Sequence, residues 1–365
     1  MNNREPLIQI SKRSQLPAAT AWLIRGGAIV LSLIFCGIIT KLVTGVDPIE
    51  VYATMIKGNF GSARRSWITL QNLSILLCIS LAVTPAFKMR FWNIGAEGQV
   101  LMGGLATTAV MMLLGNKLPG WQVNILMCLA AVAAGALWAA IPAFFKARWN
   151  TNETLFTLMM NYVATQIVAY FVIIWESTKG SGKMGIINQN TQAAWLPVPF
   201  EQKQLLTILV VAALTVFVYV YLNYTKHGYE LSVVGESERT ARYIGVKVER
   251  VIIRTMLFSG ALCGVAGLLL VGSINHTLTP DIAGGQGFTA VMVSWLSKFN
   301  PFTMIFSSLL LVFMDKGASE IASSFGLNES FSAILTGIIL FFIIGCEFFI
   351  NYKLSFRKAA GKEAE

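Results

Sequence analysis

The chain has 365 residues, of which 55% are hydrophobic and only 13% are charged, and its formal net charge is +10. A soluble domain carries about 25% charged residues, so this composition excludes an ordinary soluble protein. Apolar runs of about 20 residues, the length that crosses a bilayer, recur along the sequence. We therefore predict an all-α, polytopic membrane protein whose immediate surroundings are the lipid bilayer.

Ten apolar segments follow one another along the chain. They lie near residues 23–44, 68–87, 94–115, 121–145, 154–175, 205–223, 251–274, 285–297, 302–314 and 331–350. The eighth and ninth are short for a spanning helix of about 20 residues. We expect a cytoplasmic segment over 1–22, a single transmembrane domain over 23–352, and a cytoplasmic tail over 353–365.

The basic residues indicate the orientation of these segments. Ten crossings place both termini on one side, and 19 of the 28 Lys and Arg residues fall on that side. Because cytoplasmic loops of membrane proteins carry an excess of Lys and Arg, both termini are predicted to be cytoplasmic. The positive charge then serves orientation, and we expect no nucleic-acid partner.

Two longer polar stretches are predicted to lie outside the bilayer on the external side. Residues 45–67 are too polar to cross and are expected to form an interfacial helix. Residues 176–203 form a loop much longer than a helical hairpin needs, so we expect this loop to cover another part of the protein.

Two glycine-containing breaks interrupt the apolar pattern. The first, "FWNIGAEGQV" (91–100), contains Gly95 and Gly98. The second, "DIAGGQGFTA" (281–290), contains Gly284, Gly285 and Gly287. The breaks are five segments apart and are expected on opposite faces of the membrane. Transporters with inverted repeats place substrate sites where such paired broken helices meet, so we predict an inverted repeat.

Polar and aromatic side chains near the breaks are the candidates for a substrate pathway, since polar groups in lipid are costly and usually face a cavity or a partner. These candidates are Asn93, Glu97, Gln99, Asn161, Asn275, Gln286 and Phe288. Glu97 has three interpretations: it orients substrate, it holds the broken helix, or it is an interfacial carboxylate near Lys88 or Arg90.

The loop 224–250 is the longest one predicted to be cytoplasmic. Ser237 is expected to cap a short helix that Gly245 ends. We predict that this helix docks onto a soluble partner through Ala241, Tyr243 and Ile244, with Arg239 and Arg242 free for acidic groups. The alternative is a solvated connecting helix.

Nothing in the sequence predicts chemistry within this chain. The two histidines are far apart and the five cysteines have no metal-ligand spacing, so we expect neither catalytic nor metal-binding residues. The stretch "GSGK" (180–183) lacks the other residues of a phosphate-binding loop. We expect no cofactor here, and any ATP is expected to be used by a partner subunit.

Four motifs resemble a known family. "NIGAEGQ" (93–99), "TNETLFTLMMNY" (151–162), "GYELSVVGESERTARYIGVKVERV" (228–251) and "GGQGFTAVMVSWLSKFNP" (284–301) are similar to permease subunits of ATP-binding cassette importers for nucleosides and simple sugars. These form the basic membrane protein-linked branch of the branched-chain amino acid/ribose-type permease family. The chain departs from the family's usual pattern at 291–297, where it carries Trp295.

The resemblance implies a complex of several subunits. It implies a second, paralogous permease, a cytoplasmic ATPase with two cassettes and an external substrate-binding lipoprotein. It also implies a coupling helix that touches the ATPase, with Gly235, Glu236, Ala241, Arg242, Tyr243 and Gly245 in the matching segment. The expected function is that of an importer permease for nucleosides or simple sugars. The alternative is an ion-coupled secondary transporter of small polar solutes.

Overall fold

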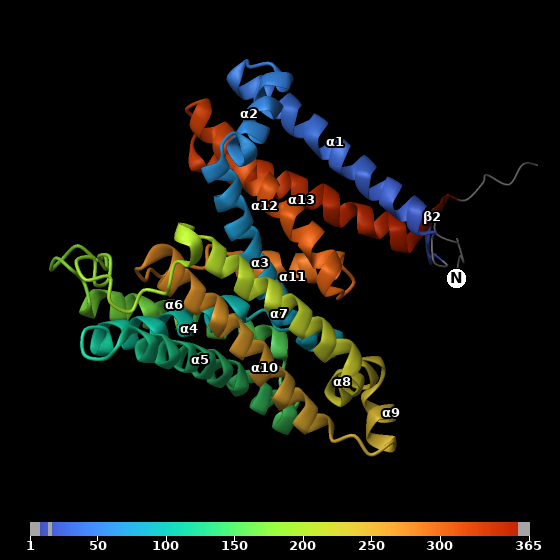
Figure 1. Ribbon diagram of the computed structural model, residues 1–365. Coiled ribbons are helices and arrows are strands. Elements are labelled where there is room, and N and C mark those ends of the chain that lie inside the picture. Colours follow the sequence, from blue (N-terminus) through green and yellow to red (C-terminus); the bar gives the residue numbers. More distant parts are fainter. Residues whose placement is uncertain (1–7, 14–16, 357–365) are drawn as a thin grey trace, which may run out of the picture. The chain divides into compact units, whose positions relative to one another are not determined.

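The computed structural model describes residues 8–13 and 17–356, and these are almost entirely helical (Figure 1). The elements are β1 (Ile8–Lys12), α1 (Ala18–Thr44), α2 (Pro48–Phe60), α3 (Ala63–Lys88), α4 (Ala96–Leu114), α5 (Gly120–Trp149), α6 (Glu153–Ile174), a 3₁₀ turn η1 (Pro199–Glu201), α7 (Leu205–Tyr224), α8 (Lys226–Glu236), α9 (Glu238–Tyr243), α10 (Val248–Leu269), a π-helical turn η2 (Leu270–Asn275), α11 (Gln286–Leu296), α12 (Pro301–Ser324), α13 (Glu329–Asn351) and β2 (Tyr352–Phe356).

Each of the ten predicted apolar segments is helical, but one of them is too short to span a membrane. Among the described residues, nine helices are long and apolar enough to cross. The predicted eighth segment, near 285–297, is α11, which has only 11 residues. The predicted ninth segment is longer than expected, because α12 continues to Ser324 and has 24 residues. Ten full crossings are therefore corrected to nine candidate spans and one short helix.

The chain divides into two compact units. Residues up to Ser66 and from Phe313 onward form the first, and Trp67–Val312 form the second. The first unit is therefore built from both ends of the sequence, whereas the second is continuous.

In the first unit, the two ends of the described chain pair with each other. Strands β1 and β2 are antiparallel, with Ile8 opposite Phe356 and Lys12 opposite Tyr352. The α1 helix packs along α13, and an Arg25 guanidinium nitrogen lies 2.6 Å from a Glu347 carboxylate oxygen. The paired strands place the two ends of this unit on the same side.

The stretch expected to form an interfacial helix contains α2, which packs against α12. The Asp47 side chain caps α2 by accepting a hydrogen bond from the Ile49 N–H at 3.1 Å. Further along, the Asn59 amide donates to the Phe313 carbonyl at 3.0 Å. A Cβ on Gly317 would collide with the Met55 side chain, so the small residue permits close packing of the two helices.

In the second unit, α4, α5 and α10 pack closely along a line of glycines. A Cβ on Gly264 would collide with the Ala131 carbonyl of α5, and one on Gly103 would lie 2.6 Å from the Gly264 Cα. Small residues let helix backbones approach each other in membranes. The glycines of α10 therefore allow these helices to pack closely.

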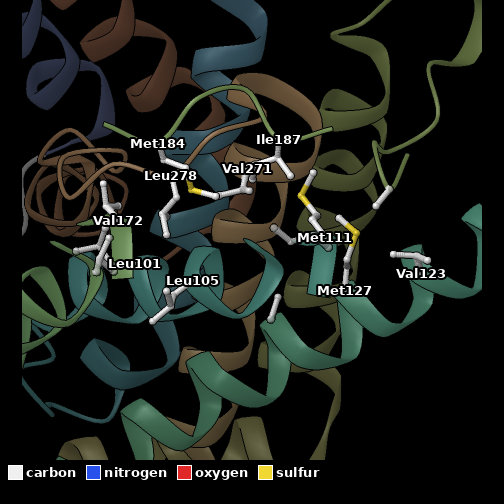
Figure 2. Packing of buried hydrophobic residues seen from close by; sticks show 14 of the residues in the cluster. Leu101, Leu105, Met111, Val123, Met127, Val172, Met184, Ile187, Val271 and Leu278 are labelled. Atoms are coloured by element: carbon white, nitrogen blue, oxygen red, sulfur yellow. The ribbon is translucent and has the colours of Figure 1, made fainter. Parts of the chain in front are cut away.

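A buried hydrophobic cluster joins these helices to the loop 176–203 (Figure 2). Leu101 of α4 and Met127 of α5 lie in the cluster. Met184 and Ile187 belong to the loop, and they pack against the same cluster. The loop therefore covers one end of the helices of this unit, as the sequence predicts.

Candidate functional site

The first glycine break is organised by the side chain of Asn93, which is fully buried. Its amide oxygen accepts hydrogen bonds from the Gly95 N–H at 3.0 Å and from the Gln99 side-chain amide at 3.2 Å. Its amide nitrogen donates to the Ser259 hydroxyl at 3.2 Å. Asn93 therefore satisfies polar groups that are exposed where α3 ends and α4 begins.

Helix α6 supplies the remaining hydrogen bonds of this break. Asn161 donates to the Ile94 carbonyl at 2.9 Å and accepts from the Gly98 N–H at 2.9 Å. The Thr157 hydroxyl accepts from the Ile94 N–H at 3.2 Å. A Cβ on Gly98 would lie 2.9 Å from the Asn161 amide oxygen, so only glycine leaves room for this contact.

The second break meets the first through the carboxylate of Glu97. One carboxylate oxygen accepts from the Gly285 N–H at 2.8 Å, and the other accepts from the Gly287 N–H at 2.8 Å. Both donors lie where α11 begins, and such free N–H groups favour a negative charge. Glu97 therefore caps α11 with two charge-assisted hydrogen bonds.

This contact corrects the expectation that the two breaks lie on opposite faces of the membrane. Glu97 is in the first turn of α4, and Gly285 directly precedes α11. The N-terminal ends of the two helices meet, so both breaks belong to one polar centre inside the second unit. The meeting of paired broken helices was itself predicted, and the inverted repeat stays a prediction.

Glycine is required at this centre for two different reasons. Gly284 and Gly285 have φ of +57° and +73°, a left-handed conformation that side chains disfavour. A Cβ on Gly287 would lie 2.5 Å from the Glu97 backbone nitrogen. The close approach of α4 and α11 therefore depends on the sequence of the second break.

The predicted pathway residues divide into two groups. Asn93, Gln99 and Asn161 are buried among protein groups and hold the break in shape. Phe288 is 42% exposed, and Asn275 is exposed at the end of η2. The side-chain oxygen of Gln286 is buried and has no hydrogen-bond partner among the described residues. Gln286 and Phe288 therefore remain the candidates for contact with a solute.

Trp295, the departure from the family pattern, lies at the other end of α11. It stacks on Trp92 with 5.4 Å between ring centroids and 22° between ring planes. Phe87 meets both rings edge-on. Because Trp92 belongs to the first break, this aromatic cluster is a second contact between the first break and α11.

The predicted coupling segment forms two short helices, α8 and α9. Ser237 caps α9 by accepting from the Thr240 N–H at 3.3 Å, and Gly245 follows the helix with φ of +87°. A Cβ on Gly235 would collide with the Lys88 carbonyl, so this glycine seats α8 against the end of α3. The predicted cap and the predicted end of the short helix are confirmed.

The predicted docking face of α9 needs correction. Ala241 has no exposed surface, because it packs inside this chain and cannot reach a partner. Arg242 is not free either, since its guanidinium lies 2.9 Å from the Glu249 carboxylate. Tyr243 is 92% exposed and Ile244 is 51% exposed, and Glu236 is exposed as well. The exposed apolar side chains at the end of α9 are therefore those of Tyr243 and Ile244.

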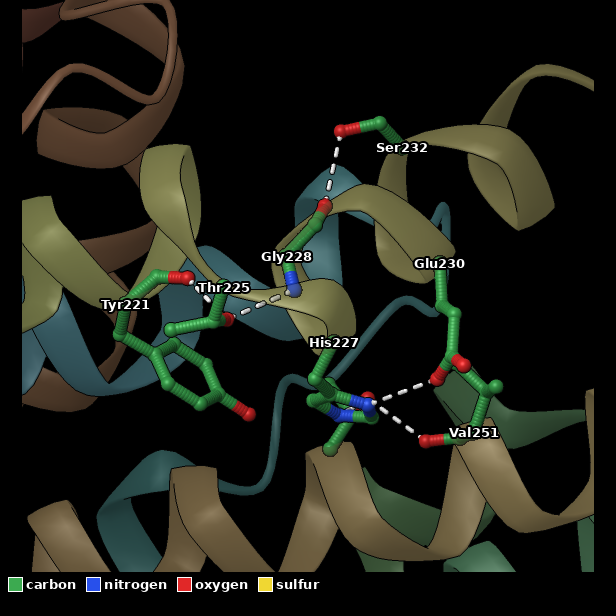
Figure 3. Close-up of polar contacts among 8 residues, drawn as sticks. Tyr221, Thr225, His227, Gly228, Glu230, Ser232 and Val251 are labelled. Carbon is green, nitrogen blue, oxygen red and sulfur yellow. Dashed lines mark hydrogen bonds and ion pairs between the residues drawn. The ribbon is translucent and has the colours of Figure 1, made fainter.

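A buried histidine, missed at the sequence level, joins α8 to α10 (Figure 3). His227 is 5% exposed, and its ring nitrogens lie 3.3 Å from the Thr255 hydroxyl and 3.4 Å from a Glu230 carboxylate oxygen. Burial lowers the pKa of His227, and the neighbouring Glu230 opposes this shift only in part. The sequence signal was limited to a histidine three residues before a glutamate in a polar loop.

Curated relatives of this chain are transporter permeases. A glucose ABC transporter permease protein of Haloferax volcanii is 29% identical over 360 residues, which are 95% of this chain and 93% of that protein. A guanosine ABC transporter permease protein of Bacillus subtilis is 29% identical over 87% of this chain and 91% of its own length. A nucleoside ABC transporter permease protein of Lactococcus lactis is 26% identical over 88% of this chain and 90% of its own length.

A family model covers the same part of the sequence. The description of the family is "branched-chain amino acid transport system / permease component", and the match extends over residues 67–344. This range contains both glycine breaks, Glu97, and the helices α8 and α9. The chain therefore belongs to the branched-chain amino acid transport system permease component family.

Proposed function

We propose that this chain is the permease subunit of an ATP-driven importer that carries nucleosides or simple sugars across the cell membrane. The observation that carries the proposal is the similarity, over most of both sequences, to permeases named for guanosine, nucleosides and glucose. The polar centre around Glu97 supports the proposal, because it joins the N-terminal ends of α4 and α11 within the second unit.

In this proposal, ATP is hydrolysed by a separate ATPase that docks on α9. Tyr243 and Ile244 are exposed apolar side chains at the tip of a soluble loop, and such groups dominate protein interfaces when buried. A second, paralogous permease completes the path, and an external lipoprotein delivers the solute. The excess of basic residues supports a cytoplasmic position for α8, α9 and both termini.

Reconstitution in proteoliposomes tests the proposal. We expect uptake of labelled guanosine or glucose only when this chain is combined with the paralogous permease, the ATPase, the lipoprotein and ATP. Without ATP, uptake should fall to the level of empty liposomes. Uptake by this chain alone, driven by an ion gradient, would instead establish the secondary-transporter alternative.

A further inference from the structure

One transmembrane helix of the first unit presents a polar face that lipid cannot cover. In α12, Asp315, Ser319 and Ser323 are exposed, and their spacing of four residues places them along one side of the helix. Asp315 lies nine residues before the end of α12, which is about 13 Å along the helix axis. A carboxylate at this depth is far from the membrane surface.

The packing of α12 against α2 does not cover this side. The side that carries Phe313, Gly317 and Glu320 faces α2, since the Asn59 amide donates to the Phe313 carbonyl and a Cβ on Gly58 would lie 2.6 Å from the Glu320 side chain. Asp315 lies two residues after Phe313, about 200° around the helix. The side of α12 that carries Asp315, Ser319 and Ser323, here called the Asp315 face, therefore points away from the α2 contact.

Asp315 makes no ion pair within the described chain, and its nearest charged neighbour is Lys316, the next residue of α12. Its near neighbour on α13 is the neutral hydroxyl of Thr336. Ionisable groups inside a membrane usually face a partner or a water-filled cavity. The Asp315 face is therefore unsuited to lipid contact.

Other exposed faces of the same unit have the opposite character. On α13, Phe341 is 74% exposed and Ile344 is 53% exposed; on α1, Leu31 is 58% exposed and Ile34 is 53% exposed. These apolar side chains suit lipid. The exposed sides of α1 and α13 are therefore apolar at these positions, whereas the Asp315 face of α12 is polar.

We propose that the Asp315 face lines a water-filled part of the permeation path, where Asp315 accepts hydrogen bonds from two adjacent hydroxyl groups of the solute. This inference rests on the proposed function. Nucleosides and simple sugars are uncharged and carry neighbouring hydroxyls, and the two oxygens of one carboxylate can accept both. Ser319 and Ser323 extend the same face with hydroxyl groups that can exchange hydrogen bonds with water or solute.

Solute analogues test the hydrogen bonds. Hydrogen bonds to a charged group contribute about 1.5–3 kcal/mol, so the complete reconstituted complex should take up guanosine about tenfold or more faster than 2′,3′-dideoxyguanosine. Asp315→Asn should remove most of this preference by slowing guanosine uptake. Glu201→Gln, at an exposed carboxylate outside the membrane, should keep the preference. An unchanged preference in Asp315→Asn would overturn the inference.

Cysteine accessibility tests the water-filled path without relying on transport. In a complex whose native cysteines are replaced, Ser319→Cys should react with a charged, membrane-impermeant thiol reagent, and guanosine should slow the reaction. Phe341→Cys, on the apolar face of α13, should not react. An unreactive Ser319→Cys, or one that cross-links to the paralogous permease regardless of guanosine, would overturn the inference. A wild-type complex that takes up neither guanosine nor glucose would contradict the proposed function itself.

Discussion

At the scale of single residues, the glutamate in the first break acts on a helix far away in the sequence. Glu97 receives N–H groups from Gly285 and Gly287, 188 and 190 residues later. Among the residues that the structure describes, no other hydrogen-bond acceptor is seen for these two donors. The stability of α11 in its place therefore depends on one side chain of α4.

Two substitutions of Glu97 should weaken the contact between α4 and α11 to different degrees. Glu97→Ala removes two charge-assisted hydrogen bonds and should lower the free energy of unfolding by about 2–3 kcal/mol, with a larger loss of uptake than of membrane abundance. Glu97→Gln keeps one acceptor oxygen and should be intermediate. Thermal unfolding in detergent and uptake measure the two effects. Asp281→Asn is the control, and an equal loss in this variant would contradict the capping role.

The two histidines, His227 and His276, should make stability depend on pH in the same direction. Burial lowers the pKa of His227, and burial together with the charge of Lys203 lowers that of His276. The unfolded chain, with pKa near 6.5, therefore binds protons more readily than the folded chain. Stability should be complete above about pH 6.5 and fall as the pH drops below it. Thermal unfolding of His227→Gln should show a weaker pH dependence, and an unchanged one would contradict this.

At the scale of elements, local sequence predicted where the short helix α9 begins and ends, but not which of its side chains are buried. Ser237 and Gly245 were predicted as the limits of a short helix because caps act through neighbouring backbone groups. The burial of Ala241 could not be predicted, since it depends on how α9 folds back onto this chain. The same holds for His227, whose partner Thr255 lies on α10.

Two substitutions in α9 should separate folding from docking. Tyr243→Ala removes an exposed ring, so it should leave membrane insertion and thermal stability unchanged while weakening co-purification with the ATPase. Ala241→Asp buries a charge and should destabilise the segment by about 3 kcal/mol. Co-purification and thermal unfolding are measured for both. Normal ATPase retention by Tyr243→Ala would show that this tip is not the docking surface.

Close packing of α5 against α10 should require glycine at position 264. Gly264→Ala places a methyl group against the Ala131 carbonyl and should cost about 1–3 kcal/mol of stability. At Gly337 of α13, a Cβ would meet nothing within 4 Å, so Gly337→Ala should be neutral or slightly stabilising. Thermal unfolding of the two variants in detergent gives the comparison, and equal midpoints would contradict close packing at Gly264.

At the scale of the whole molecule, hydrophobic pattern and basic residues predicted the helical segments, and the described structure confirmed their helical character. The pattern could not distinguish α11 from a spanning helix, because hydropathy does not show that a helix begins inside the protein at a contact such as that between Glu97 and Gly285. The two glycine breaks were expected to meet, but the hydrogen bond from the Gly285 N–H to Glu97 could not be predicted, because it joins groups 188 residues apart in the sequence. Contacts between distant segments decide the candidate site.

The orientation of the whole chain can be checked by labelling. Cysteines introduced at Ser181 and Asn190, both exposed in the loop 176–203, should react with an impermeant thiol reagent in intact cells. Those at Ser237 and Lys353 should react only after the cells are opened. Labelling at Ser237 from outside would contradict both the orientation and the docking of the ATPase on α9.

The pairing of β1 with β2 has a consequence for the order of synthesis. The ribosome completes residues 67–312 as one continuous stretch, so the second unit can assemble while translation continues. The first unit must wait, because Ile8 pairs with Phe356. Strand β1 therefore stays without its partner until the residues up to Phe356 have been synthesised.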